Sequence, residues 1–157
     1  MDAAALERGY RGIQAQIHPD RFAASGDAER RASMQWTTRV NEAYRTLRDP
    51  VQRAKYLLEL NGVDVAFETN TAMPPDFLMR QMELREALEA AGDARDADAL
   101  DALRASLRAD KLELERALAE AIDARGDLTG AAGLTRKLMF LDKLDAEIDL
   151  AYEALEA

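Results

Sequence analysis

Three consecutive residues, His18-Pro19-Asp20, place the only imidazole of the 157-residue chain beside a carboxylate. Such a pair has the chemistry of a general acid and base. Pro19 fixes its own φ and restricts the backbone of His18, which makes the tripeptide stiff. The sequence offers no nucleophile, oxyanion donors or glycine-rich phosphate loop beside it. We therefore interpret the tripeptide as a rigid recognition loop rather than a catalytic centre.

Two helices must position this loop. Apolar residues at helical spacing predict a first helix over about 3–17, which ends because Pro19 disfavours helical backbone in the residue before it. A second helix is predicted over about 28–48, with Asp27 as its N-cap. Trp36 lies in the apolar stripe of this second helix, and we expect it to fill the core.

The remainder of the chain also has helical periodicity. A short helix is predicted over 51–60, followed by a connector rich in turn residues. Three longer helices are then predicted, over about 75–91, 98–124 and 131–156. Each carries an apolar stripe, and the connections are short, so these helices predict an antiparallel three-helix bundle. The fold class is therefore all-α.

Composition excludes several classes of protein. The chain has no cysteine, which rules out disulfides and thiolate metal ligation, and one histidine cannot build a metal site unless carboxylates supply the other ligands. We expect no metal and no cofactor. No apolar run is long enough to span a membrane, and the first residues lack the features of a secretory signal, so we expect a cytoplasmic protein.

Charge is divided unevenly along the chain. Residues 1–56 carry a net charge of +3 and the remainder −12, which together give the overall −9. The acidic part argues against a nucleic-acid ligand, because phosphate binding requires clustered cations. The basic part suits an acidic protein surface. We therefore expect two segments that bind different partners.

The context of the tripeptide is more specific than the tripeptide itself. Tyr10-Arg11 lies upstream, Arg21-Phe22 follows directly, and residues 40–50 read VNEAYRTLRDP. This combination resembles the J-domain, the module with which J-proteins engage heat-shock ATPases of the DnaK class. Other segments resemble the HscB family, the J-type co-chaperones of iron–sulfur cluster assembly; they are AKYLLELNG at 54–62, FLM at 77–79, MELRE at 82–86 and RKLMFLDKL at 136–144.

The resemblance covers essentially the whole chain. It implies an L-shaped, two-domain arrangement with a J-domain over 1–60, a connector over 61–74 and a scaffold-binding bundle over 75–157. HscB proteins normally begin earlier, so the J-domain is expected to lack its first helix. Apolar residues that this helix would cover are then expected to lose their cover; they are Leu6, Tyr10, Ile13, Val40 and Tyr44.

The resemblance also implies two sites. The tripeptide would contact an ATPase chaperone of the HscA/DnaK class and trigger its hydrolysis of ATP, with electrostatic attraction from Arg8, Arg11 and Arg21. An IscU-type scaffold protein would bind the bundle through residues matching Leu78, Met82, Glu83, Arg85, Glu86 and Phe140. Helical geometry supports the second site, because Leu78 and Met82 lie about 100° to 140° around the helix from Phe77 and its core face.

Other functions remain open on the sequence alone. A general J-protein whose acidic bundle binds unfolded clients is one alternative, and a purely structural helical adaptor is another. An enzyme that uses His18 and Asp20 as acid and base is the least favoured, because the stiff loop offers no pocket. Nothing in the apolar pattern indicates a dimer seam, and we expect a monomer.

Overall fold

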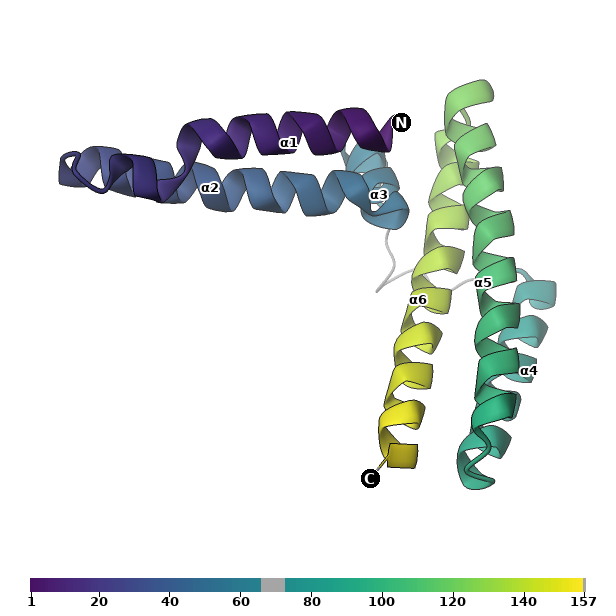
Figure 1. The fold of residues 1–157 in the computed structure, drawn as a ribbon. Coiled ribbons are helices and arrows are strands. Elements are labelled where there is room, and N and C mark those ends of the chain that lie inside the picture. Colours follow the sequence, from purple (N-terminus) through teal and green to yellow (C-terminus); the bar gives the residue numbers. More distant parts are fainter. Residues whose placement is uncertain (66–72, 157) are drawn as a thin grey trace. The chain divides into compact units, whose positions relative to one another are not determined.

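The computed structural model describes residues 1–65 and 73–156 (Figure 1). Its elements are α1 (Ala3–Ile17), the 3-10 turn η1 (Pro19–Phe22), α2 (Asp27–Arg48), α3 (Pro50–Leu60), α4 (Pro75–Asp93), α5 (Ala97–Ala119), the π-helical turn η2 (Glu120–Ala124) and α6 (Leu128–Glu156). The described residues contain no β-strand, which confirms the predicted all-α class. The chain divides into two compact units, Met1–Tyr56 and Leu57–Ala157.

Local signals set the ends of the first two helices. The Asp2 carboxylate caps α1 by accepting hydrogen bonds from two backbone N–H groups at 2.9 and 3.0 Å. At the other end, His18 is the C-cap, with ψ at 131°, immediately before Pro19. The predicted N-cap of α2 is wrong, because Gly26 holds that position. Asp27 lies one residue later, in the first turn, where a carboxylate faces the positive end of the helix dipole.

The first unit is a hairpin of α1 and α2 with a polar and aromatic seam. The rings of Tyr10 and Tyr44 stack with centroids 4.0 Å apart. The Tyr10 hydroxyl donates to Asn41 Oδ1 at 2.8 Å and accepts from Gln14 Nε2 at 2.6 Å. The Tyr44 hydroxyl donates to a carboxylate oxygen of Glu7. These polar and aromatic side chains therefore join the two helices at this seam.

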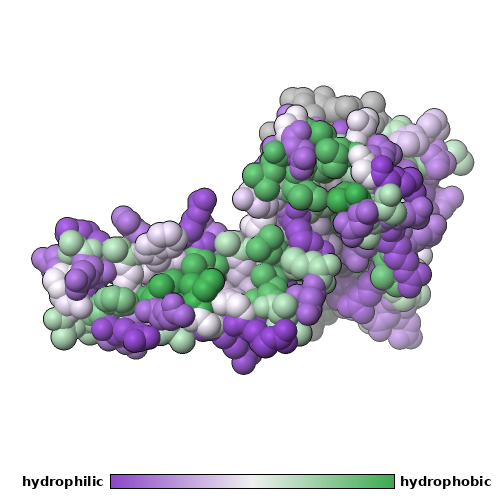
Figure 2. Space-filling view, turned by 90° about the horizontal axis from the view of Figure 1, so that it is seen from above, coloured by the Kyte–Doolittle hydropathy of each residue, from purple (hydrophilic) through white to green (hydrophobic). Residues whose placement is uncertain are grey.

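Little of the hairpin is fully buried. Within residues 1–48, all of which the structure describes, Ser33 alone is buried. Trp36 is 61% exposed, so its predicted place in a core is wrong: α1 covers the Ser33 face of α2, and Trp36 lies about 60° around the helix from it. Figure 2 shows apolar side chains interspersed with polar ones on the viewed face of the hairpin.

The five residues that were expected to lack cover are exposed to different degrees. Ile13 is exposed, whereas Leu6, Tyr10, Val40 and Tyr44 are half-buried. An open hollow of about 600 Å³ lies beside the stacked tyrosines. Its lining residues come from α1, α2, α3 and the residue at the start of the chain; they are Met1, Ala3, Leu6, Glu7, Tyr10, Tyr44, Arg48 and Arg53.

The second unit contains the bundle of α4, α5 and α6, and its core is apolar. The three predicted stripes meet there and are largely buried, which confirms their interpretation. The central cluster consists of Phe77, Leu84, Leu103, Leu107, Leu141, Leu144 and Ile148. The predicted helix over 98–124 is interrupted near its end, where the π-helical turn η2 follows α5.

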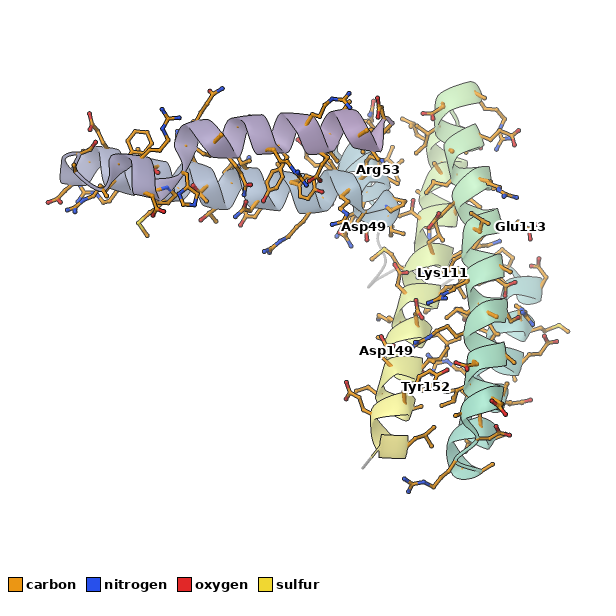
Figure 3. The ribbon with its side chains drawn as sticks, viewed as in Figure 1. Asp49, Arg53, Lys111, Glu113, Asp149 and Tyr152 are labelled. Carbon is orange, nitrogen blue, oxygen red and sulfur yellow. The ribbon has the colours of Figure 1, made fainter. Side chains whose placement is uncertain are left out.

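Charged groups bridge α5 and α6 outside this core (Figure 3). Lys111 Nζ lies 2.6 Å from Asp142 Oδ1 and 3.1 Å from Asp145 Oδ2. Burial alone would lower the pKa of Lys111, but its hydrogen bonds to these two carboxylates raise the pKa above its usual value. Arg104 pairs with Asp149 on the same side of the bundle.

The segment before the bundle is described only in part. Val65 is buried, and its carbonyl accepts a hydrogen bond from the Arg136 guanidinium of α6 at 2.9 Å. The predicted connector spans 61–74, and residues 66–72 of it lie outside the described residues. The predicted limits of the two domains therefore stay predictions.

Candidate functional site

The His-Pro-Asp loop lies at the turn between α1 and α2. The ring of His18 folds toward the turn, where its Nδ1 accepts a hydrogen bond from the backbone N–H of Asp20 at 3.3 Å. The neutral ring then carries its proton on Nε2. Both side chains are exposed, 55% for His18 and 90% for Asp20. The loop thus presents a donor nitrogen and a carboxylate to solvent on a stiff backbone.

Contacts from both sides hold the backbone of this loop. The buried Ser33 hydroxyl of α2 donates to the carbonyl of Ile17, the residue before the loop, at 2.6 Å. The Arg21 guanidinium turns back and donates to the carbonyl of Ala15 at 2.7 Å. Helix carbonyls near a C-terminus have no partner within the helix, so these bonds satisfy groups that would otherwise face water. The side chains of His18 and Asp20 stay exposed to solvent on this braced backbone.

The predicted arginines differ in their surroundings. Arg8 is exposed, and Arg11 is exposed while pairing with Glu7 at 2.7 Å. The hydroxyl of Tyr44, together with Arg11, lowers the pKa of Glu7. Arg21 is exposed but bonded to the helix end. Two of the three charges therefore lie on α1, and the third belongs to the loop structure itself.

The loop does not have the geometry of an enclosed active site. His18 Nδ1 lies 3.5 Å from Asp20 Oδ2, and both groups are open to water. Acid–base catalysis depends on holding a substrate against such a pair in an enclosed pocket. Among the residues that the structure describes, no group of three or more metal-ligating side chains lies close enough to hold an ion. The arrangement suits binding.

A second exposed feature lies on α4. Leu78, Met79 and Met82 are 42%, 64% and 61% exposed, and we call these three residues the α4 ridge. Phe77 and Leu84 of the same helix are buried in the core. Leu78 and Met82 were predicted to leave the core face, and they do. Met79 was missed, although its spacing of three residues from Met82 places the two side chains on one face.

The other residues predicted for this site are less uniform. Phe140 is half-buried against the core cluster. Arg85 donates two hydrogen bonds of 3.2 Å to Glu147 of α6. Glu83 pairs with Arg80 of its own helix at 3.4 Å, and Glu86 is exposed. Five of the six predicted residues lie on α4, and Phe140 comes from α6. Their role in binding stays a prediction.

Comparisons with known proteins agree with this architecture. A family profile described as the HSCB C-terminal oligomerisation domain matches residues 73–149. A co-chaperone protein HscB homolog from Azoarcus sp. (strain BH72) is 54% identical over 99% of this chain and 88% of its own length. One from Burkholderia vietnamiensis is 55% identical over 99% of this chain and 89% of its own length.

Solved structures give the same family. The chaperone HscB from Vibrio cholerae matches with a TM-score of 0.81 and 35% identity, over 99% of this chain and 91% of that one. The human co-chaperone protein HscB matches with a TM-score of 0.87 and 29% identity, over 96% of this chain and 74% of that one.

The all-α fold and these comparisons define a helical protein of the co-chaperone class. The chain belongs to the HscB family of co-chaperones. None of its described helices is long and apolar enough to cross a membrane.

Proposed function

We propose that this chain is a J-type co-chaperone of iron–sulfur cluster assembly. Its His-Pro-Asp loop stimulates ATP hydrolysis by a chaperone of the HscA/DnaK class, and its bundle brings an IscU-type scaffold protein to that chaperone. One observation carries the proposal: the chain holds a braced, exposed His-Pro-Asp loop in one compact unit and an exposed apolar ridge in the other. An adaptor between two proteins needs two such surfaces.

The loop acts by binding one conformation of the ATPase better than another. A ligand shifts an equilibrium only through its differential affinity for the two states. His18 Nε2 and the Asp20 carboxylate, both exposed on the stiff loop, offer one donor and one acceptor, and this pairing favours a partner surface that matches both. Arg8 and Arg11 increase the rate of encounter with an acidic partner.

The α4 ridge supplies apolar anchors for the scaffold. Exposed leucine and methionine side chains that become buried in an interface contribute through removal of apolar surface from water. Glu83, Arg85 and Glu86 lie on the same helix and provide a polar rim. Phe140 of α6 is half-buried against the core, so only part of its ring can contact the scaffold. The cluster itself is cargo, held by the scaffold.

The proposal extends to the organisation of the chain. We assign a J-domain to residues 1–60, a connector to 61–74 and the scaffold-binding bundle to 75–157, in the cytoplasm. We also propose a monomer, although the family profile that matches the bundle is described by oligomerisation. Light scattering on the purified chain at several concentrations tests this: a mass near 17.4 kDa supports a monomer, and a multiple of it contradicts one.

The test measures ATP hydrolysis by an HscA-type chaperone with the full chain added, with and without an IscU-type scaffold. We expect stimulation that rises with scaffold and is lost in His18→Gln. Met82→Ala should weaken scaffold binding about tenfold, a loss of about 1.4 kcal/mol, within the range for an interface anchor. Met34→Ala is the matched control, because Met34 is also 61% exposed but lies on α2. It should leave scaffold affinity unchanged.

Each alternative predicts a different result. If binding of client proteins survives Leu78→Ala, Met82→Ala and Phe140→Ala together, the chain is a general J-protein. If His18→Gln changes neither the ATPase rate nor any partner's behaviour, the hairpin is a structural adaptor. If the wild-type chain neither stimulates the ATPase of the chaperone nor binds the scaffold, the proposed function is overturned.

A further inference from the structure

The ridge lies on the less firmly packed half of α4. Within residues 75–83, all of which are described, Phe77 alone is buried, whereas Leu84 and Ala91 anchor the rest of the helix. The N-cap, Pro74, has no side chain that could bond the free N–H groups of the first turn. An open cavity of about 200 Å³ lies beside Phe77. Apolar packing alone therefore fixes this half of the helix weakly.

Arg80 makes the polar contacts that hold this half against α5. Its Nε donates to Asp110 Oδ2 at 2.8 Å, and its Nη2 donates to Ser106 Oγ at 2.7 Å. A third contact, to Glu83 Oε2 at 3.4 Å, stays within α4. A guanidinium that binds several acceptors at once fixes direction as well as distance, because its donors lie in one rigid plane.

The arrangement of side chains around α4 separates Arg80 from the ridge. With Phe77 at the centre of the core face, Arg80 lies about 60° to one side and Arg85 about 80° to the other. Arg80 bonds α5, and Arg85 bonds Glu147 of α6. The α4 ridge occupies the outward side, about 100° to 200° from Phe77. The two arginines thus brace the rotation of the helix from both flanks, and Arg80 lies on the flank farther from the ridge.

We propose that Arg80 is a positioning residue for scaffold docking, which fixes the rotation of α4 through Asp110 and Ser106 and so aims the α4 ridge outward. This inference rests on the proposed function of the ridge. A ridge held in one orientation binds a partner without first losing rotational freedom, so its affinity is higher than that of a mobile ridge. Arg80 itself does not need to touch the partner.

The experiment compares the affinity of an IscU-type scaffold for four forms of the full chain. Arg80→Ala should weaken binding about fivefold through lost preorganisation. The exchanged pair, Arg80→Asp with Asp110→Arg, should return the affinity to within about twofold of wild type, because it restores the contact with reversed charge. Arg104→Ala is the matched control: it breaks a bridge between α5 and α6 and lowers the melting temperature, but it leaves the affinity unchanged.

Amide hydrogen exchange over residues 75–83 provides a measurement that does not need the partner. Exchange there should accelerate in Arg80→Ala, return in the exchanged pair and stay unchanged in Arg104→Ala. Wild-type affinity in Arg80→Ala overturns the inference, as does equal weakening in the exchanged pair. The wild-type chain could fail to bind the scaffold while amide exchange changes in the three variants as expected. In that case the proposed function fails, but the role of Arg80 in holding α4 is still supported.

Discussion

The hairpin and the bundle are both built from antiparallel helices, but different interactions hold them together. Between α1 and α2 the seam consists of stacked tyrosines, amides and a carboxylate, and Ser33 is the single buried side chain of these two helices. Among α4, α5 and α6 a continuous cluster of leucines is buried, with ion pairs outside it. Antiparallel helices are therefore held together by a polar and aromatic seam in the hairpin and by an apolar core in the bundle.

The difference in packing between the two units leads to a difference in their stability. Partly exposed hydrogen bonds contribute about 0.5–1.5 kcal/mol each, whereas full burial of a leucine contributes about 1.5–3 kcal/mol. Stability therefore concentrates in the bundle, to which the hydrogen bonds of Arg80 tie the half of α4 that carries the α4 ridge. The hairpin has less to stabilise it, and its contacts are directional. They fix the end of α1, and with it the loop at His18.

The largest expected change in the free energy of unfolding comes from a buried leucine of α5, compared with an exposed leucine of the same helix. Leu107 is fully buried and Leu112 is 48% exposed, both on α5. Leu107→Ala should lower the free energy of unfolding by about 3 kcal/mol, because it leaves a cavity in the apolar core. Leu112→Ala should change it by less than about 0.5 kcal/mol.

Urea denaturation followed by circular dichroism measures both values. A loss for Leu107→Ala no greater than that for Leu112→Ala would contradict the apolar core. The proposed stimulation of the ATPase through His18 is expected to survive Leu112→Ala, because Leu112 lies on α5 and not on the hairpin.

A smaller effect is expected in the hairpin. Ser33→Ala removes the hydroxyl that bonds the Ile17 carbonyl, and the loss of one such bond costs about 1 kcal/mol. Amide exchange over residues 18–22 should accelerate, because one of the two braces of the loop is lost, while exchange in α5 and α6 stays unchanged. Ser25→Ala, in the turn before α2, is the control and should leave the loop protected. Equal exchange in both variants would show that Ser33 does not brace the loop.

Helix positions could be predicted from sequence because their signals are local. The first helix ends where Pro19 requires it, and the leucine stripe from Leu100 to Leu118 identifies the core face of α5 by its spacing alone. The exposure of Leu78 and Met82 follows from the same geometry, given Phe77 as the core residue. The periodicity of apolar residues indicates which face of a helix a residue occupies. This information was sufficient to predict the core faces of these helices.

Contacts between distant segments could not be predicted in this way. Trp36 has the spacing of a core residue, but no helix of the described first unit covers its face. Phe140 was predicted to bind the scaffold, and it packs half-buried against the core cluster. The bond between Arg80 and Asp110 joins residues 30 positions apart, and either charge alone looks like part of a solvated surface. Only the packing of α4 on α5 shows that they meet.

The smallest expected effect compares one tyrosine in each unit. The hydrogen bond to Glu7 raises the pKa of Tyr44 above its ordinary value of 10.0. The hydrogen bond to Asp101 does the same to the pKa of Tyr152 in the bundle. A phenol whose pKa is raised by folding stabilises the folded state below pH 10.0, and this contribution is lost as the pH rises through the folded pKa. Both contacts therefore weaken in alkaline solution, and the contact of Tyr44 also weakens in acid, where Glu7 becomes protonated.

Single substitutions should separate these two shifts. Glu7→Gln should return the pKa of Tyr44 toward 10.0 and leave that of Tyr152 unchanged, and Asp101→Asn should do the reverse. Titration of the tyrosine ring carbons by NMR measures both groups in one sample. Because Glu7 lies in the seam of the hairpin, its substitution should also loosen α1, whereas Asp101 lies outside the leucine core and its loss should leave the bundle intact. If both variants loosen their units equally, the polar seam contributes no more to the hairpin than a surface bond contributes to the bundle.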